Sequence, residues 1–151
     1  MKRIFLLIFF ITSGSFINSQ TNDAEFNTFF KKFQSAVKNN NVTEIVDMTN
    51  FPFIFKWVAS EEPVSKESFI SNTNISYIPG YETLSKAKFN KTITLSKSGG
   101  EEETVGFAYE NGYYILSYSA SSADEGWVSY SDYFFGLVNG EYKYIKNESG
   151  D

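Results

Sequence analysis

The chain contains no cysteine and no histidine among its 151 residues. Without cysteine it forms no disulfide, and it offers no thiolate as a nucleophile or as a ligand of zinc or of an iron–sulfur cluster. Without histidine it lacks the base of Ser-His-Asp and Cys-His catalysis and the commonest ligand of transition metals. We therefore expect a protein with no metal site and no cofactor.

Basic residues are also scarce, with 13 Lys and Arg against 18 Asp and Glu and a formal net charge of -5. Because phosphate binding requires clustered Lys and Arg, this balance speaks against a nucleic-acid partner. Aromatic residues are plentiful, at 19% of the chain. A chain of this length fits one domain. Together these features predict a small, aromatic-rich globular domain.

The first 19 residues have the pattern of a secretory signal peptide. Lys2 and Arg3 precede an unbroken apolar run at positions 4–11, small and polar residues follow, and Ser19 ends a candidate cleavage site. The run is too short for a membrane span, which needs about 20 apolar residues. We expect residues 1–19 to be removed and residues 20–151 to form a single exported domain, periplasmic or secreted, of a bacterial protein, with no membrane span left.

Two helices are predicted first. Residues 23–38 carry an apolar stripe at helical spacing, formed by Phe26, Phe29, Phe30, Phe33 and Val37. Asn22 resembles the first residue of a capping box. Three asparagines at 39–41 end this helix, and Asn41 is placed to cap a short second helix at 42–48.

The next segment is mixed. Residues 51–57 alternate as in a strand, and Pro52 favours the strand start or a sheet edge. Residues 59–64 read as a polar loop, and Ser65 as the cap of a third short helix that contains Phe69. Residues 75–84 include Pro79-Gly80 and are predicted as a loop in which Ile75, Ile78 and Tyr81 are partly buried.

Strands dominate the remainder, at residues 88–97, 102–110, 113–119, 127–138 and 141–146. Asn111-Gly112 and Asn139-Gly140 are strong signals for two-residue hairpins. Residues 147–151 read as a frayed tail. Helices followed by hairpins predict an α+β fold, with N-terminal helices packed on a curved antiparallel sheet that forms a cone or roll.

This order of elements resembles the nuclear-transport-factor-two-like superfamily, which includes ketosteroid isomerases and scytalone dehydratases. The residues that carry the resemblance are Phe26, Phe29, Phe30, Phe33, Ala36, Val37, Val42, Ile45, Val46 and the closing segment 133–145. The likeness lies in topology and includes no specific motif. It implies a cone-shaped α+β fold.

The resemblance also implies a possible chemistry. Ketosteroid-isomerase-like members use a carboxylate base and a Tyr donor inside the cone, and residues of these types are Asp47, Asp132, Tyr130 and Tyr133. On the predicted strand 127–138, Asp132 shares a face with Tyr130 and Phe134, so a carboxylate lies among large neighbours. A buried Asp can act as a base because burial raises its pKa. The competing interpretation is an ordinary acid at the rim of the sheet.

Two further clusters have plainer interpretations. The acidic run 101–103 at a hairpin is predicted to be solvated. Six tyrosines between 109 and 133 could form a platform for a partner or a carbohydrate, although strand propensity also explains them. We therefore favour noncatalytic binding of a small apolar ligand or an envelope protein. The alternative is an isomerase- or dehydratase-like enzyme that uses Asp132 and Tyr130.

Overall fold

The computed structural model describes residues 18–72, 78–96 and 100–151. Most of the predicted leader and the predicted buried residue Ile75 lie outside these ranges. The elements are α1 (Asn18–Lys38), α2 (Val42–Asp47), β1 (Thr49–Trp57), β2 (Ser60–Val64), α3 (Lys66–Ser71), α4 (Tyr81–Lys86), β3 (Lys91–Ser96), β4 (Glu101–Glu110), β5 (Tyr113–Ser122), β6 (Trp127–Val138) and β7 (Glu141–Gly150). No helix within the described ranges is long and apolar enough to cross a membrane.

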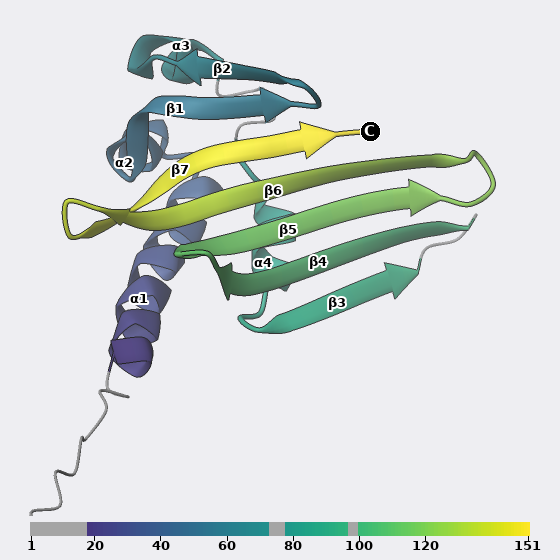
Figure 1. Ribbon diagram of the computed structural model, residues 1–151, viewed down its shortest axis with the longest axis horizontal. Helices are drawn as coiled ribbons and strands as arrows, with labels where there is room; N and C mark the ends of the chain where they lie inside the picture. The colour runs from purple at the N-terminus through teal and green to yellow at the C-terminus, as the bar shows by residue number, and fades with distance from the viewer. Residues whose placement is uncertain (1–17, 73–77, 97–99) are drawn as a thin grey trace, which may run out of the picture.

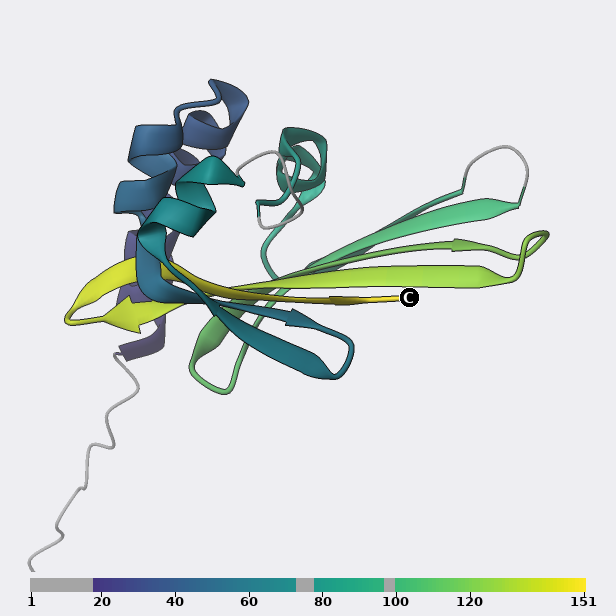
Figure 2. The same cartoon turned by 90° about the horizontal axis from the view of Figure 1, so that it is seen from above.

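The strands form one seven-stranded sheet in the order β2-β1-β7-β6-β5-β4-β3. All neighbouring pairs are antiparallel except β1 and β7, which run parallel. The helices lie on one face of this sheet, so α1 and α4 are seen behind the strands in Figure 1. Figure 2 shows β3 to β6 curving away beyond the helices. The predicted α+β fold with N-terminal helices on a curved sheet is confirmed.

Aromatic rings fill the space between α1 and the sheet. Phe26, Phe30 and Phe33 are buried on the predicted stripe. The ring of Phe26 stacks on that of Tyr114 from β5, with centroids 3.6 Å apart. The ring of Phe33 meets that of Phe135 from β6 edge-on at 5.3 Å. These contacts fix α1 against the middle strands, because ring pairs of this kind add to the gain from burying apolar area.

The helix boundaries follow local chemistry with one exception. The side chain of Asn41 accepts a hydrogen bond from the backbone N–H of Glu44 at 3.3 Å, as predicted for the start of α2. Ser65 caps α3 in the same way through Ser68 at 3.2 Å. The prediction that Asn22 caps α1 is wrong, because the helix already begins at Asn18 and no Gly or Pro interrupts it.

Both Asn-Gly hairpins are confirmed. Asn111 and Gly112 have φ values of 51° and 87°, and Asn139 and Gly140 have 53° and 84°. A type I′ turn requires positive φ at both central positions, which Asn tolerates and Gly adopts without cost. These turns set the antiparallel register of β4 with β5 and of β6 with β7.

The loop predicted at 59–64 is instead the edge strand β2, which pairs with β1. Its exposed sequence Ser-Glu-Glu-Pro lacks the apolar alternation from which a strand is predicted. Polar residues and proline are common on edge strands because they prevent pairing with another chain. Consequently β1, which carries Pro52, is not at the edge. Pro52 lies near the strand start, where the register between β1 and β7 shifts, so its missing N–H interrupts no regular ladder.

Two further predictions need correction. Residues 81–86 form α4 where a loop was predicted, and the helix is held by Leu84, which is fully buried. The segment predicted as a frayed tail is the second half of β7. Asn147 and Ser149 are buried there, because β7 lies between β1 and β6 and pairs with both.

Candidate functional site

The two faces of the sheet differ in what covers them. Phe107, Tyr114 and Phe135 point toward α1, where their rings contact Phe26. Side chains alternate along a strand, so their sequence neighbours point to the opposite side. We call that opposite side the open face, since none of the described helices lies on it (Figures 1 and 2).

A groove of about 710 Å³ lies on the open face and is partly open to solvent. Its floor includes small side chains of β4 and β5, namely Gly106, Ala108 and Ser117. Side chains from β3 and β6 rise on either side, because these strands flank β4 and β5 in the sheet. The residues along the two sides are Asn90, Lys91 and Thr92 toward β3, and Tyr130 and Asp132 on β6.

The carboxyl group of Asp132 is half-buried at one side of this groove. Burial raises the pKa of Asp132, and the nearby carboxylates of Glu148 and Glu110 act in the same direction. A hydrogen bond from the hydroxyl of Ser117 and the charge of Lys146 oppose this shift. The net result is a carboxyl group that holds its proton more tightly than an exposed Asp.

Glu148 is the direct neighbour of Asp132 across the β6–β7 pair, but its surroundings are different. Nζ of Lys146 lies 2.6 Å from Oε1 of Glu148, and Nζ of Lys56 lies 3.5 Å from Oε2. The hydrogen bond from Lys146 is the main reason why the pKa of Glu148 is lowered. Lys146 also lies over the ring of Phe134, at 4.0 Å from its centroid. Both lysines thus form ion pairs with Glu148.

The structure divides the four residues predicted from the superfamily chemistry. It brings Asp132 and Tyr130 to the same groove, as their shared strand face predicts. Tyr133 points to the opposite side, where burial raises the pKa of its hydroxyl. Asp47 is exposed at the end of α2. The groove also lies on the face away from the helices, whereas the superfamily chemistry uses the interior of the cone.

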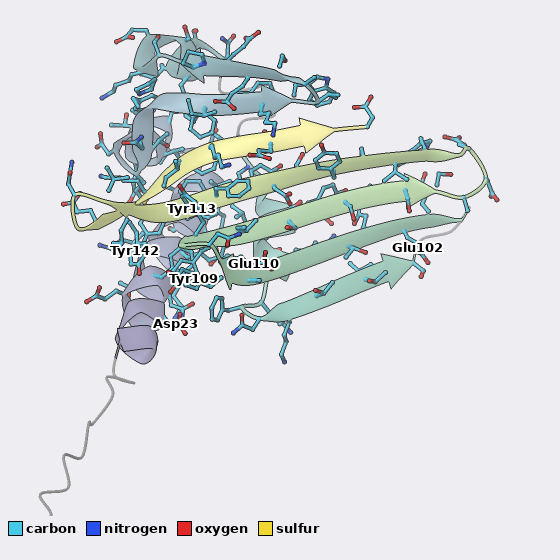
Figure 3. All side chains as sticks on the ribbon, viewed as in Figure 1. Asp23, Glu102, Tyr109, Glu110, Tyr113 and Tyr142 are labelled. Carbon is cyan, nitrogen blue, oxygen red and sulfur yellow. The ribbon has the colours of Figure 1, made fainter. Side chains whose placement is uncertain are left out.

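The predicted tyrosine platform is likewise split between the two faces. Tyr113 and Tyr130 belong to the open face, while Tyr109 and Tyr114 are on the side of α1, where their rings lie 4.8 Å apart. Figure 3 shows Tyr109 and Tyr142 close to the N-terminal part of α1. There the hydroxyl of Tyr114 donates to Asp23 at 2.7 Å. Burial is the main cause of the raised pKa of Tyr114, so this phenol stays protonated and helps fix α1.

The polar cluster of Glu103, Lys86 and Tyr118 was not predicted from the sequence. Glu103, from the run predicted to be solvated, points to the helix side, and its side chain is only 14% exposed. It accepts hydrogen bonds from Lys86 of α4 at 3.3 Å and from the hydroxyl of Tyr118 at 3.1 Å. The signal was present in the alternation, because Glu103 has the same parity as the buried residues Val105 and Phe107. The cluster attaches α4 to the sheet.

The other acidic residues of the same run remain at the surface. Glu101 and Glu102 are exposed, and Figure 3 shows Glu102 at the opposite end of β4 from Glu110. Across the described ranges, no group of three or more Asp or Glu side chains is arranged to hold a metal ion.

No family model matches this sequence, and no curated protein matches it. Solved structures do match across most of the chain. An NTF2-like protein from Cytophaga hutchinsonii has 14% identity, a TM-score of 0.44, and coverage of 85% of this chain and 96% of its own. An NTF-2-like protein of unknown function from Shewanella oneidensis has 7% identity, a TM-score of 0.43, and coverage of 86% and 99%.

A cystatin-like fold protein from Burkholderia xenovorans is similar at 10% identity, with a TM-score of 0.48 and coverage of 88% of this chain and 93% of its own. Each of these proteins matches the chain along most of its length at a TM-score below 0.5. A likeness at such identities concerns the fold alone and transfers no activity, ligand or partner.

Proposed function

We propose that this chain is an exported, noncatalytic binding domain that takes a small ligand in the groove of the open face. The observation that carries the proposal is the groove itself, about 710 Å³ in volume and floored by Gly106, Ala108 and Ser117. Volumes of roughly 300–1,000 Å³ are typical of small-molecule sites. Small floor residues on a rigid sheet leave this space open without any movement of the chain.

Noncatalytic binding suits this geometry better than the enzymatic alternative. An isomerase or dehydratase of this superfamily type needs its Asp and Tyr in a pocket that excludes water, because water weakens the electrostatic contribution of both groups. Asp132 and Tyr130 instead lie in a groove that is open to solvent, and Tyr130 is 44% exposed. The interior side of the sheet, where such a pocket belongs, is packed with rings next to α1.

A partner protein from the cell envelope is the second candidate. It is favoured by Val128 and Tyr130, which are 58% and 44% exposed and lie next to each other on the open face of β6. Exposed apolar side chains in one patch are typical of contact surfaces. We further propose that the ligand or the partner is met outside the cytoplasm, because residues 1–19 have the pattern of a signal peptide.

The test is to fill the groove. A Cβ at Gly106 would make only ordinary contacts, 3.5 Å from Oγ1 of Thr92, so Gly106→Phe adds a ring to the floor without forcing the backbone. Small-molecule fragments that bind the purified protein in ligand-observed NMR should lose binding to this variant. The matched control is Leu137→Phe, which adds a ring at an exposed position of β6 outside the groove. Fragments that bind both variants equally well, or a screen with no binder, would refute the groove as the site.

A further inference from the structure

Among the described residues, the lysines beside the groove pair with Glu148 and not with Asp132. Glu148, Asp132 and Ser117 stand in one row across β7, β6 and β5, and Lys56 of β1 continues it beyond Glu148. Within the described ranges, the ion pairs of this row run from Lys56 and Lys146 to Glu148. Within the same ranges, Asp132 accepts a hydrogen bond from the hydroxyl of Ser117 but forms no ion pair.

The other charged groups along the groove do not supply the missing cation. Glu110 adds a second negative charge on the β4 side and acts on Asp132 in the same direction as Glu148. Lys91, at the start of β3, is the cation among the described groove residues. Strands β4 and β5 separate Lys91 from Asp132. Lys91 also pairs with Phe107, whose ring points toward α1, so its side chain belongs to the helix side of the sheet. The groove thus carries a net negative charge that lies toward Asp132.

We propose that the groove selects a small organic cation, whose ammonium or amidinium group pairs with the carboxylate of Asp132 while its apolar part lies on Gly106 and Ala108. The inference rests on the proposed function and specifies its ligand class. A half-buried carboxylate with a hydroxyl donor on one side offers its remaining lone pairs to N–H donors from the groove. A charge-assisted hydrogen bond of this kind is stronger than a neutral one. An apolar ligand leaves that carboxylate unpaired and an anion is repelled by it, so the groove discriminates by charge.

Benzylammonium and benzyl alcohol test the inference, because they have nearly the same size and shape and differ in charge. Binding to the purified protein is measured by ligand-observed NMR and by calorimetry. We expect benzylammonium to bind about tenfold more tightly than the alcohol, the factor that one charge-assisted hydrogen bond provides. Asp132→Asn should abolish this preference. Glu61→Gln, on the same face but on the exposed strand β2, should retain it.

A second variant keeps the carboxylate of Asp132 and adds a positive charge to the groove that repels a cationic ligand. Ser119 lines the groove on β5 beside Tyr130, and Ser119→Lys adds a competing ammonium group there. It should weaken benzylammonium binding and affect the alcohol less. Circular dichroism checks that each variant is folded.

The outcomes separate this inference from the proposed function. Equal affinities of the two probes, or a preference that survives Asp132→Asn, would overturn the cation while leaving the groove as a binding site. Failure of benzylammonium to bind at all also overturns it. If fragments of every charge bind the Gly106→Phe variant as well as the parent protein, the proposed function is refuted as well.

Discussion

The ring of Tyr130 lies against the backbone of Gly150, its partner across the β6–β7 pair. A Cβ placed at Gly150 would lie 2.8 Å from Cε1 of Tyr130 and 2.9 Å from its hydroxyl oxygen, closer than real side chains approach. Because Gly150 has no side chain, the ring of Tyr130 can lie over the end of β7 at one side of the groove. Glycine covered by an aromatic ring on the neighbouring strand is a known device for fixing strand register.

Gly150→Ala tests this relationship. Because the ring of Tyr130 is 44% exposed and can turn aside, we expect the added methyl group to displace it and to lower the free energy of unfolding by up to about 1 kcal/mol. Urea denaturation measures the loss, and the affinity of the groove for fragments should fall with it. Gly106→Ala is the control for stability, since a Cβ there makes only ordinary contacts, the nearest at 3.5 Å. Equal stability of the two variants would argue against the contact.

Phe26 is the second target, because its ring stacks on Tyr114 and also contacts Phe30, Phe107 and Phe135. We expect Phe26→Ala to cost about 3–5 kcal/mol, the usual range for removing a buried Phe. Leu137→Ala, at a position 54% exposed, should change stability by less than about 0.5 kcal/mol. Comparable denaturation midpoints for the two variants would contradict the packing described for α1.

Asp132 and Glu148 should respond to pH in opposite ways although they are neighbours. The lowered pKa of Glu148, due first to Lys146, means that its ionised form stabilises the fold above the pKa of an unfolded Glu. That contribution is lost as pH falls through the lower, folded-state pKa. The pKa of Asp132 is raised, first by burial, so its protonated form is the one that favours the fold. Stability is therefore lost as pH rises through this raised pKa.

Two variants separate these effects. Glu148→Gln should lower the free energy of unfolding at neutral pH, by up to about 1 kcal/mol as for other partly exposed pairs. Asp132→Asn should leave it unchanged or raise it. Both differences from the parent protein should shrink in acid, where the carboxyl groups are protonated. Thermal unfolding across a pH series provides the measurement, and a loss of the same sign for both variants at neutral pH would refute the assignment.

The end of β7 should be essential for stability. The buried side chain of Asn147 donates to the backbone carbonyl of Asp132 at 3.2 Å and accepts from the hydroxyl of Ser149 at 2.9 Å. Asn147→Ala should cost about 1–3 kcal/mol, because it leaves buried polar groups without partners. Removal of the exposed Asp151 is the control and should change nothing. A chain that unfolds at the same temperature without residues 147–151 would show that this strand is dispensable.

Export is tested through the predicted leader. Ile8→Arg places a charge in the apolar run and should keep the protein in the cytoplasm with residues 1–19 attached. The parent chain should appear in the periplasm or the medium with a mass that corresponds to cleavage after Ser19. Leu137→Arg adds the same charge at an exposed strand position and should be exported normally. Export of the Ile8 variant with normal cleavage would refute the signal peptide.

The elements that the sequence predicted are those whose cause is local. The Phe stripe of α1, the cap at Asn41 and the turn at Asn111-Gly112 each depend on residues a few positions apart. β2 and the end of β7 were missed because long-range pairing creates them. Ser-Glu-Glu-Pro becomes a strand only because β1 pairs with it, and Asn147 is buried only because two strands enclose it.

The candidate site divides in the same way. Alternation along β6 correctly placed Asp132 and Tyr130 on one face. It could not say which face the helices cover, because both faces of β6 carry aromatic residues, with Tyr133 and Phe135 on one and Tyr130 and Phe134 on the other. The lysines that serve Glu148 come from β1 and β7, so the charge balance at Asp132 depends on contacts distant in the sequence.

The parallel pairing of β1 with β7 also has a consequence for the order of synthesis. β1 is made early and β7 is the last strand along the chain, yet β7 joins β1 to β6. Until β7 has emerged from the ribosome, the hairpin of β1 and β2 has no attachment to the rest of the sheet. Pairing of β7 is therefore the step that joins the hairpin of β1 and β2 to strands β3 to β6, and a chain in which β7 is unpaired holds its sheet in two separate parts.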